Sequence, residues 1–408
     1  MHRVFRMQNT VQPYGWGSHI ALAELLGLPG PTAEPQAELW MGAHPKAPSK
    51  VWVQNQWQDL EGMIAQDPIF FLGESTAARF ENMFPFLFKV LAVEKPLSIQ
   101  AHPNDRQARN GFERENKQGI SLDSSIRNYK DNRHKPECVC ALTPFWVLYG
   151  FRDPADIVSI LEPIWPSYPR AGLDLLKKNP QGNGLRDFFQ DLLTQSEKAR
   201  HQLVSHVTRK ATAGDDANPI YQWILRLNAI YPGDVGCIAP GFLNLICLQP
   251  GQALFLPSGL LHAYLEGVAI EIMANSDNVL RGGLTPKHLD VKELIRILNF
   301  QCPQVKILSP LPITKTEAGY PCRAEEFALS VIHIGSNQTH SVCDRNPGPE
   351  ILLCTKGRVA LNCPDESKTL SISKGESVLI TGGVVAYDLM GEGVVYKAST
   401  AIGRDGTP

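Results

Sequence analysis

Two side chains with metal-binding atoms stand two positions apart in the segment 96–103, which reads Pro-Leu-Ser-Ile-Gln-Ala-His-Pro. The apolar residues between flanking prolines predict a short β-strand. Because successive side chains of a strand point to opposite faces, Gln100 and His102 are expected on the same face. An amide oxygen beside an imidazole nitrogen would form one half of a metal site.

Two later segments contain residues that can complete such a site. Glu137 ends the run His-Lys-Pro-Glu, and His262 follows a predicted strand and turn. Together with Gln100 and His102 they would offer two nitrogen and two oxygen ligands, a set that zinc accepts, whereas calcium and magnesium prefer oxygen alone. Isolated His-Pro pairs usually mark turns, and His44 is interpreted in that way.

Three basic residues lie close in sequence to these candidate ligands, namely Lys89, Lys135 and Arg281. An anionic substrate would explain them, and a phosphate group is the obvious candidate. The alternative is that they are solvated surface charges. That alternative is weak for Lys89, which interrupts an apolar run, and it stays open for the other two.

The elements expected to position these residues form alternating blocks. Short strands are predicted at 86–93, 97–101 and 139–142, next to the candidate ligands. Residues 152–232 are predicted to be helical, because Asp153-Pro154 is a helix-start signal and the apolar residues between 185 and 193 follow helical spacing. Strand patterns then return before and after His262.

From about residue 304 the chain is again rich in predicted strands, with regularly spaced turns that indicate a β-sandwich or jelly roll. Residues 373–380 echo residues 249–256, since both have a turn with glycine, then polar and small residues, then an apolar strand. This weak repeat predicts two barrels of one type. No histidine follows the second copy in the corresponding sequence, so the second barrel is expected to be without a metal.

The composition is typical of a globular protein, because 43% of the 408 residues are hydrophobic and 20% are charged. A formal net charge of −2 gives no reason to expect nucleic acid or an anionic membrane as a partner. No stretch approaches the roughly 18 apolar residues of a spanning helix, and the first residues lack the apolar core of a signal peptide. Nine scattered cysteines predict no disulfide framework, so a cytoplasmic location is expected.

Taken together, these segments match a known pattern: the chain resembles the type I mannose-6-phosphate isomerase (phosphomannose isomerase) family of the cupin class. The matching motifs occur in the order of the family and extend over about residues 11–290. They are Tyr14–Gly17, Ala37–Pro45, Pro85–Leu91, Pro96–Asn104, Asn128–Asp131, His134–Glu137, His262–Gly267 and Glu271–Lys287.

The resemblance implies a mainly β protein with two cupin-like jelly-roll barrels and an inserted α-helical domain. Residues 1–151 and 233–303 are expected to form the catalytic domain, 152–232 the helical domain, and 304–408 a C-terminal jelly roll without metal. The family pattern also implies one Zn²⁺ per chain and a small sugar phosphate as the substrate. We expect a monomer that binds neither nucleic acid nor membrane.

The resemblance further implies that zinc is bound by Gln100, His102, Glu137 and His262, and that Arg281 has a catalytic role. The expected reaction is the reversible interconversion of mannose 6-phosphate and fructose 6-phosphate. This is a reaction of carbohydrate metabolism that leads towards GDP-mannose biosynthesis.

Aldose–ketose isomerisation moves a proton between C1 and C2 through an enediol(ate), so it needs a base and a group that holds negative charge on oxygen. Zinc can polarise that oxygen. Arg281 is a poor base because the pKa of arginine exceeds about 12, and we assign it to positioning the substrate or stabilising the oxyanion. The base is left open among Lys135, His134, Asp277 and Glu271.

Substrate contacts are expected from Lys89, Lys135, Trp16 and Glu271, and one lysine is not expected both to bind phosphate and to act as the base. Two other classes of function compete with the isomerase. Two histidines and a carboxylate on a barrel are also the usual ligands of non-haem iron oxygenases, although Gln100 and the basic residues argue against that class. A sugar-binding or storage barrel without catalysis is the other alternative.

Overall fold

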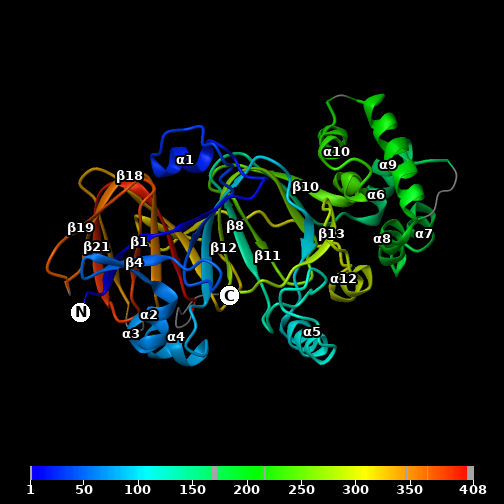
Figure 1. Ribbon diagram of the computed structural model, residues 1–408. Helices are drawn as coiled ribbons and strands as arrows, with labels where there is room; N and C mark the ends of the chain where they lie inside the picture. The colour runs from blue at the N-terminus through cyan, green and yellow to red at the C-terminus, as the bar shows by residue number, and fades with distance from the viewer. Residues whose placement is uncertain (1, 168–171, 216, 345–346, 365, 402–408) are drawn as a thin grey trace.

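The computed structural model describes residues 2–167, 172–215, 217–344, 347–364 and 366–401. The fold is mainly β, with two antiparallel sheets and accessory helices. Figure 1 shows the strands of the C-terminal part at one end, the other sheet in the middle, and helices α6 to α10 at the opposite end. Among the described helices, none combines the length and the apolar character needed to cross a membrane.

The first sheet carries the candidate metal ligands, and β12 lies at its centre because it pairs with β6, β7, β8 and β9. The described residues give this sheet ten strands, which are β2 (Thr10–Gln12), β3 (Glu38–Met41), β6 (Phe86–Val93), β7 (Ile99–Ala101), β8 (Glu137–Ala141), β9 (Phe145–Phe151), β10 (Leu243–Leu248), β11 (Ala253–Leu256), β12 (His262–Ala274) and β13 (Leu280–Gly283).

The second sheet combines the C-terminal part of the chain with its first strand. Its eleven strands in the described residues are β1 (Val4–Gln8), β4 (Lys50–Val53), β5 (Gln56–Asp59), β14 (Leu311–Pro312), β15 (Glu317–Gly319), β16 (Ala328–Ile334), β17 (Thr339–Cys343), β18 (Glu350–Asn362), β19 (Leu370–Ser373), β20 (Ser377–Ile380) and β21 (Ala386–Ser399). Val4 of β1 pairs with Ile380 of β20, and β1 also pairs with β4. Strand pairing therefore does not follow a boundary at residue 304, and the expected three-part division of the chain stays a prediction.

The helices are concentrated between the strands β9 and β10. They are α1 (Ala21–Leu26), α2 (Leu60–Gln66), α3 (Pro68–Leu72), α4 (Glu74–Arg79), α5 (Asp105–Lys117), α6 (Pro154–Leu161), α7 (Leu173–Lys178), α8 (Gly184–Thr194), α9 (Glu197–Thr212), α10 (Pro219–Ile230), α11 (Ala239–Phe242) and α12 (Val291–Ile297), with 3₁₀ turns η1 (Glu162–Ile164) and η2 (Val235–Ile238). The side chain of Asp153 caps α6 by accepting from the backbone N–H of Ala155, as its sequence signal predicts.

Hydrophobic packing fixes these layers against one another. Phe188 and Phe189 of α8 share a buried cluster with Phe151 of β9, so the helices pack on the first sheet. A second cluster joins the two sheets and contains Phe86 from the first and Leu329 from the second. Each fully buried side chain of this size contributes roughly 1.5–3 kcal/mol, so the strand ends that carry the candidate ligands rest on a rigid support.

Candidate active site

Three of the four candidate ligands converge at the ends of strands in the first sheet. His102 follows β7 directly, Glu137 begins β8, and His262 begins β12. Their side chains are at most 2% exposed. Pairing across the sheet brings these strand ends together, because His262 is opposite Gln100 of β7, and Glu137 is opposite Leu256 at the end of β11, the strand that directly precedes β12.

The geometry of these three residues is that of a metal-binding cluster, which we call the His–Glu–His cluster (His102, Glu137 and His262). Their potential ligand atoms all lie within 4.8 Å of one another. His102 Nε2 is 3.3 Å from Glu137 Oε1, and His262 Nε2 is 3.3 Å from Glu137 Oε2. Both histidines thus turn Nε2 towards the same carboxylate.

Backbone carbonyls orient the two imidazole rings. His102 Nδ1 is 2.7 Å from the carbonyl oxygen of Asn278, and His262 Nδ1 is 3.0 Å from that of Leu260. A carbonyl accepts a hydrogen bond only, so each Nδ1 carries the proton and each Nε2 keeps its lone pair. Burial lowers the pKa of His102 to about 4, although the Glu137 carboxylate opposes this shift. His102 is therefore neutral at pH 7, as a metal ligand must be.

The cluster also contains buried polar atoms that need a partner. His102 Nε2, His262 Nε2 and Glu137 Oε2 are buried and have no hydrogen-bond partner among the described residues. Buried polar groups are almost always paired. Burial would raise the pKa of Glu137, but Lys135 and His102 hold it well below its usual range, so the carboxylate is charged. A cation that accepts N and O ligands would satisfy all three atoms, and zinc fits this set.

Lys135 contacts the His–Glu–His cluster directly. Its Nζ lies 2.9 Å from Glu137 Oε1, and the residue is 8% exposed. The alternative that Lys135 is a solvated surface charge is therefore wrong.

Arg281 lies on β13, where it is opposite Gln100 of β7. Partial burial lowers the pKa of its guanidinium, and no ion pair or hydrogen bond of this side chain is found among the described residues. Partial burial lowers the pKa of Lys287, and the nearby charge of Arg281 lowers it further. Arg281 is thus next to Gln100, and the exposed Lys287 adds a second positive charge near Arg281. Lys287 was not singled out from the sequence.

Lys89 occupies a different, fully enclosed position. Its Nζ lies 3.1 Å from Glu271 Oε2 and 3.3 Å from Glu38 Oε2, while Tyr264 donates a 2.9 Å hydrogen bond to Glu271 Oε1. Burial would lower the pKa of Lys89, but Glu271 and Glu38 raise it well above its usual value. Lys89 is a permanent counter-ion between two carboxylates. Glu38 was missed because β3 and β6 lie far apart in the sequence, whereas Tyr264 contacts Glu271 within β12.

Asp277 belongs to a third group of side chains. Its Oδ1 is 3.5 Å from His44 Nε2 and its Oδ2 is 2.8 Å from Lys46 Nζ. Burial would raise the pKa of Asp277, but the hydrogen bonds to these two residues hold it well below its usual range. His44 therefore pairs with Asp277 and lies outside the His–Glu–His cluster, in agreement with its interpretation as a structural residue.

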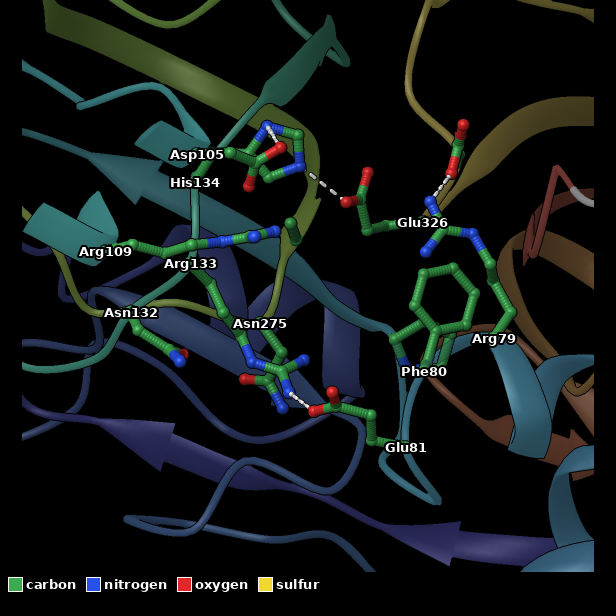
Figure 2. Close-up of a pocket in the computed structure, with 13 residues that line it drawn as sticks. Arg79, Phe80, Glu81, Asp105, Arg109, Asn132, Arg133, His134, Asn275 and Glu326 are labelled. Carbon is green, nitrogen blue, oxygen red and sulfur yellow. Dashed lines mark hydrogen bonds and ion pairs between the residues drawn. The ribbon is translucent and has the colours of Figure 1, made fainter. Parts of the chain in front are cut away.

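The structure places His134 among carboxylates outside the His–Glu–His cluster, and Trp16 against a hydrophobic cluster. His134 Nε2 lies 2.6 Å from Glu326 Oε1, and Nδ1 faces Asp105, as Figure 2 shows. Trp16 packs beside the hydrophobic cluster that contains Tyr264. Of the predicted site residues, the structure brings together His102, Glu137, His262 and Lys135, with Gln100 and Arg281 on the adjoining strands.

Asn278 was not recognised from the sequence as a functional residue, although it connects two parts of the site. Its carbonyl orients His102, and its side-chain oxygen accepts from the backbone N–H groups of Lys130 and Asp131. Its amide nitrogen donates to the carbonyl of Arg133 over 2.8 Å. Asn278 thus ties a metal-ligand candidate to the segment that leads to Lys135.

Comparison with known proteins agrees with this geometry. Residues 4–154 match the model of the phosphomannose isomerase type I catalytic domain. Mannose-6-phosphate isomerase from Escherichia coli (strain K12) is 39% identical over 392 residues, which cover 95% of this chain and 97% of that protein. The chain belongs to the type I phosphomannose isomerase family. It is therefore an isomerase enzyme.

Other members of the type I phosphomannose isomerase family are also similar over nearly the whole chain. The human mannose-6-phosphate isomerase is 34% identical over 406 residues, with 93% of each chain covered. A crystal structure of zinc-bound mannose 6-phosphate isomerase superposes with a TM-score of 0.90 at 37% identity, covering 98% of this chain and 100% of that one. A variant of phosphomannose isomerase from Salmonella typhimurium gives a TM-score of 0.92 at 37% identity.

Proposed function

We propose that the protein interconverts D-mannose 6-phosphate and D-fructose 6-phosphate with one Zn²⁺ bound per chain. The observation that supports this most strongly is the His–Glu–His cluster, in which three buried ligand atoms point at one another and lack hydrogen-bond partners in the described parts of the chain. Gln100 is proposed as the fourth ligand because β7 places it opposite His262. Zinc would supply a Lewis acid that polarises a substrate oxygen.

Lys135 is proposed as the group that transfers the proton between C1 and C2 through an enediol(ate). Among the four candidate bases, Lys135 is the one whose side chain contacts a residue of the His–Glu–His cluster. The other three are held elsewhere: His134 by Glu326, Asp277 by Lys46, and Glu271 by Lys89. A base must lie within hydrogen-bond reach of the substrate carbon–hydrogen bond that it attacks, and Lys135 borders the site where the reacting oxygens would bind.

Arg281 and Lys287 are proposed to bind the phosphate group of the substrate. The guanidinium has no partner among the described residues, and its fork geometry suits a phosphate. This role agrees with substrate positioning by Arg281. Lys89, by contrast, is proposed to hold Glu271 in place rather than to contact phosphate, because two carboxylates already occupy it.

The proposal also covers the closure of the two sheets and the division of the chain into domains. We propose that each sheet closes as a cupin-like jelly-roll barrel, that α6 to α10 form an inserted domain, and that the C-terminal barrel binds no metal. The enzyme is proposed to act as a cytoplasmic monomer. Trp16 is proposed as part of the substrate-facing wall, since it packs beside the cluster that includes Tyr264.

The experiment that tests the proposed function is solvent exchange at C2 of the sugar phosphate in deuterium oxide. Wild-type enzyme should convert mannose 6-phosphate to fructose 6-phosphate and exchange the C2 proton, which binding alone cannot produce. Lys135→Met should lose exchange while keeping its zinc, and the exposed control Lys95→Met should match the wild type. Conversion by Lys135→Met at the wild-type rate would contradict the assignment of the base.

A further inference from the structure

A second cavity lies apart from the His–Glu–His cluster. Its volume is about 450 Å³, within the range of roughly 300–1,000 Å³ typical of ligand pockets. It is bordered by the end of α4, by α5, by the segment that precedes Lys135, and by the end of β12. Phe80, Arg109, Asn132, Asn275 and Glu326 are among its lining residues.

Most of the charged groups in this cavity compensate one another. Arg79 pairs with Glu325, and Arg133 Nη2 lies 3.1 Å from Glu81 Oε2. His134 lies between two carboxylates, with Glu326 Oε1 at 2.6 Å from Nε2. These contacts fix the walls of the cavity and leave those charges with little attraction for a further ligand.

Arg109 is the exception. No ion pair or hydrogen bond of its guanidinium occurs within the described parts of the chain. Figure 2 shows its side chain on the opposite side of the cavity from the Phe80 ring. Up to five N–H donors of Arg109 are therefore available to an acceptor in the cavity, and phosphate matches their geometry.

In the described part of the chain, Glu326 has a carboxylate oxygen that lacks a hydrogen-bond donor. Its Oε1 is engaged by His134, but its Oε2 is buried without a hydrogen-bond partner among the described residues. That oxygen needs a donor, and a hydroxyl group provides one. Asn132 and Asn275 offer amide groups to further hydroxyls, and Phe80 offers the apolar face on which a carbon chain can rest.

We propose that this cavity is a second binding site, for a phosphorylated sugar or sugar alcohol, with the phosphate on Arg109 and a hydroxyl on Glu326. The ligand class follows from the exposed Arg109 guanidinium, which suits an anion, and from the buried Glu326 Oε2, which needs a donor such as a hydroxyl group. His134, which lines this cavity, directly precedes Lys135 in the chain. The inference is independent of the proposed reaction, since none of the cavity's lining residues belongs to the His–Glu–His cluster.

Calorimetric titration of the zinc-loaded enzyme with sorbitol 6-phosphate tests this proposal, because this compound lacks the carbonyl group and is not turned over. Wild type should bind two equivalents per chain. Arg109→Gln should weaken the second site at least about tenfold, as expected when a charged hydrogen-bond partner is lost. Arg106→Gln, an exposed arginine on the same helix but outside the cavity, should keep both sites.

Three outcomes would overturn the proposal. One is a single equivalent bound by the wild type that Arg109→Gln does not weaken, and another is an unchanged second site in Arg109→Gln. The third is an equal affinity of the second site for sulfate, which supplies acceptors but no donor and would reduce the site to a simple anion site. Isomerase turnover of Arg109→Gln in the absence of sorbitol 6-phosphate should equal that of the wild type, which confirms that the variant is folded.

Discussion

Replacing Lys89 by methionine tests whether this lysine is a structural counter-ion or a phosphate ligand. Met keeps the length of the side chain but leaves the carboxylates of Glu38 and Glu271 buried without their cation. Removing one partner of a buried ion pair costs about 3–5 kcal/mol. The folded-state pKa of Lys89 is raised, so its contribution is fully present below its unfolded-state pKa of about 10.4, which includes neutral pH.

This loss of folding free energy corresponds to a measurable change in the unfolding temperature. An unfolding entropy of about 2.1 cal/mol/K per residue over 408 residues gives roughly 0.9 kcal/mol/K, so Lys89→Met should lower Tm by roughly 4–6 °C. Scanning calorimetry at neutral pH measures this shift. Lys50→Met, an exposed lysine on β4, should change Tm by less than about 1 °C and serves as the matched control.

A second variant separates electrostatics from packing. Adding Glu271→Gln to Lys89→Met removes one of the two carboxylates that are left without a cation, so part of the decrease in Tm should be reversed. An unchanged Tm in Lys89→Met, combined with a large rise in KM for mannose 6-phosphate, would refute the counter-ion role and would favour direct contact with phosphate.

Three further predictions follow from the site. His262→Ala should lose zinc by metal analysis while His44→Ala keeps it, and the reverse pattern would show that the wrong histidine was chosen. Arg281→Lys should raise KM and lower turnover at least about tenfold with zinc still bound, because a lysine lacks the fork geometry; unchanged kinetics would exclude this role. Burial would lower the pKa of His134, but Glu326 raises it, so the stabilisation is present below about pH 6.5 and is lost as pH rises through the folded-state pKa. His134→Gln should therefore lower Tm more at about pH 5.5 than at about pH 9, and equal losses at both would contradict this ion pair.

The metal cluster was predictable because its ligands are marked by local patterns. Gln-x-His after an apolar run, a glutamate before a strand and a histidine after a turn each place a side chain at the end of a strand. The structure brings three of these residues together, while the fourth ligand, Gln100, remains a proposal supported by its pairing opposite His262. Local sequence could not show which partners the remaining charged residues find.

Lys89 and His134 illustrate that limit. The apolar run around Lys89 predicted that it is not a surface charge, but its carboxylate partners come from β3 and β12, which pair with β6 from distant parts of the chain. His134 looked like a possible base because it stands beside Lys135, yet its ring binds Glu326, 192 residues later in the chain. No strand was predicted at Val4–Gln8, and these residues form β1, which pairs with β20 of the second sheet.

The central claim is that a metal at the His–Glu–His cluster is required for isomerisation. The most direct measurement removes the metal from the purified enzyme with a chelator, verifies its absence by elemental analysis, and then titrates zinc back while following the conversion of mannose 6-phosphate in a coupled assay. Activity should be lost in the metal-free protein and should rise in proportion to zinc until one ion is bound per chain. Full activity in the verified metal-free protein would contradict the claim.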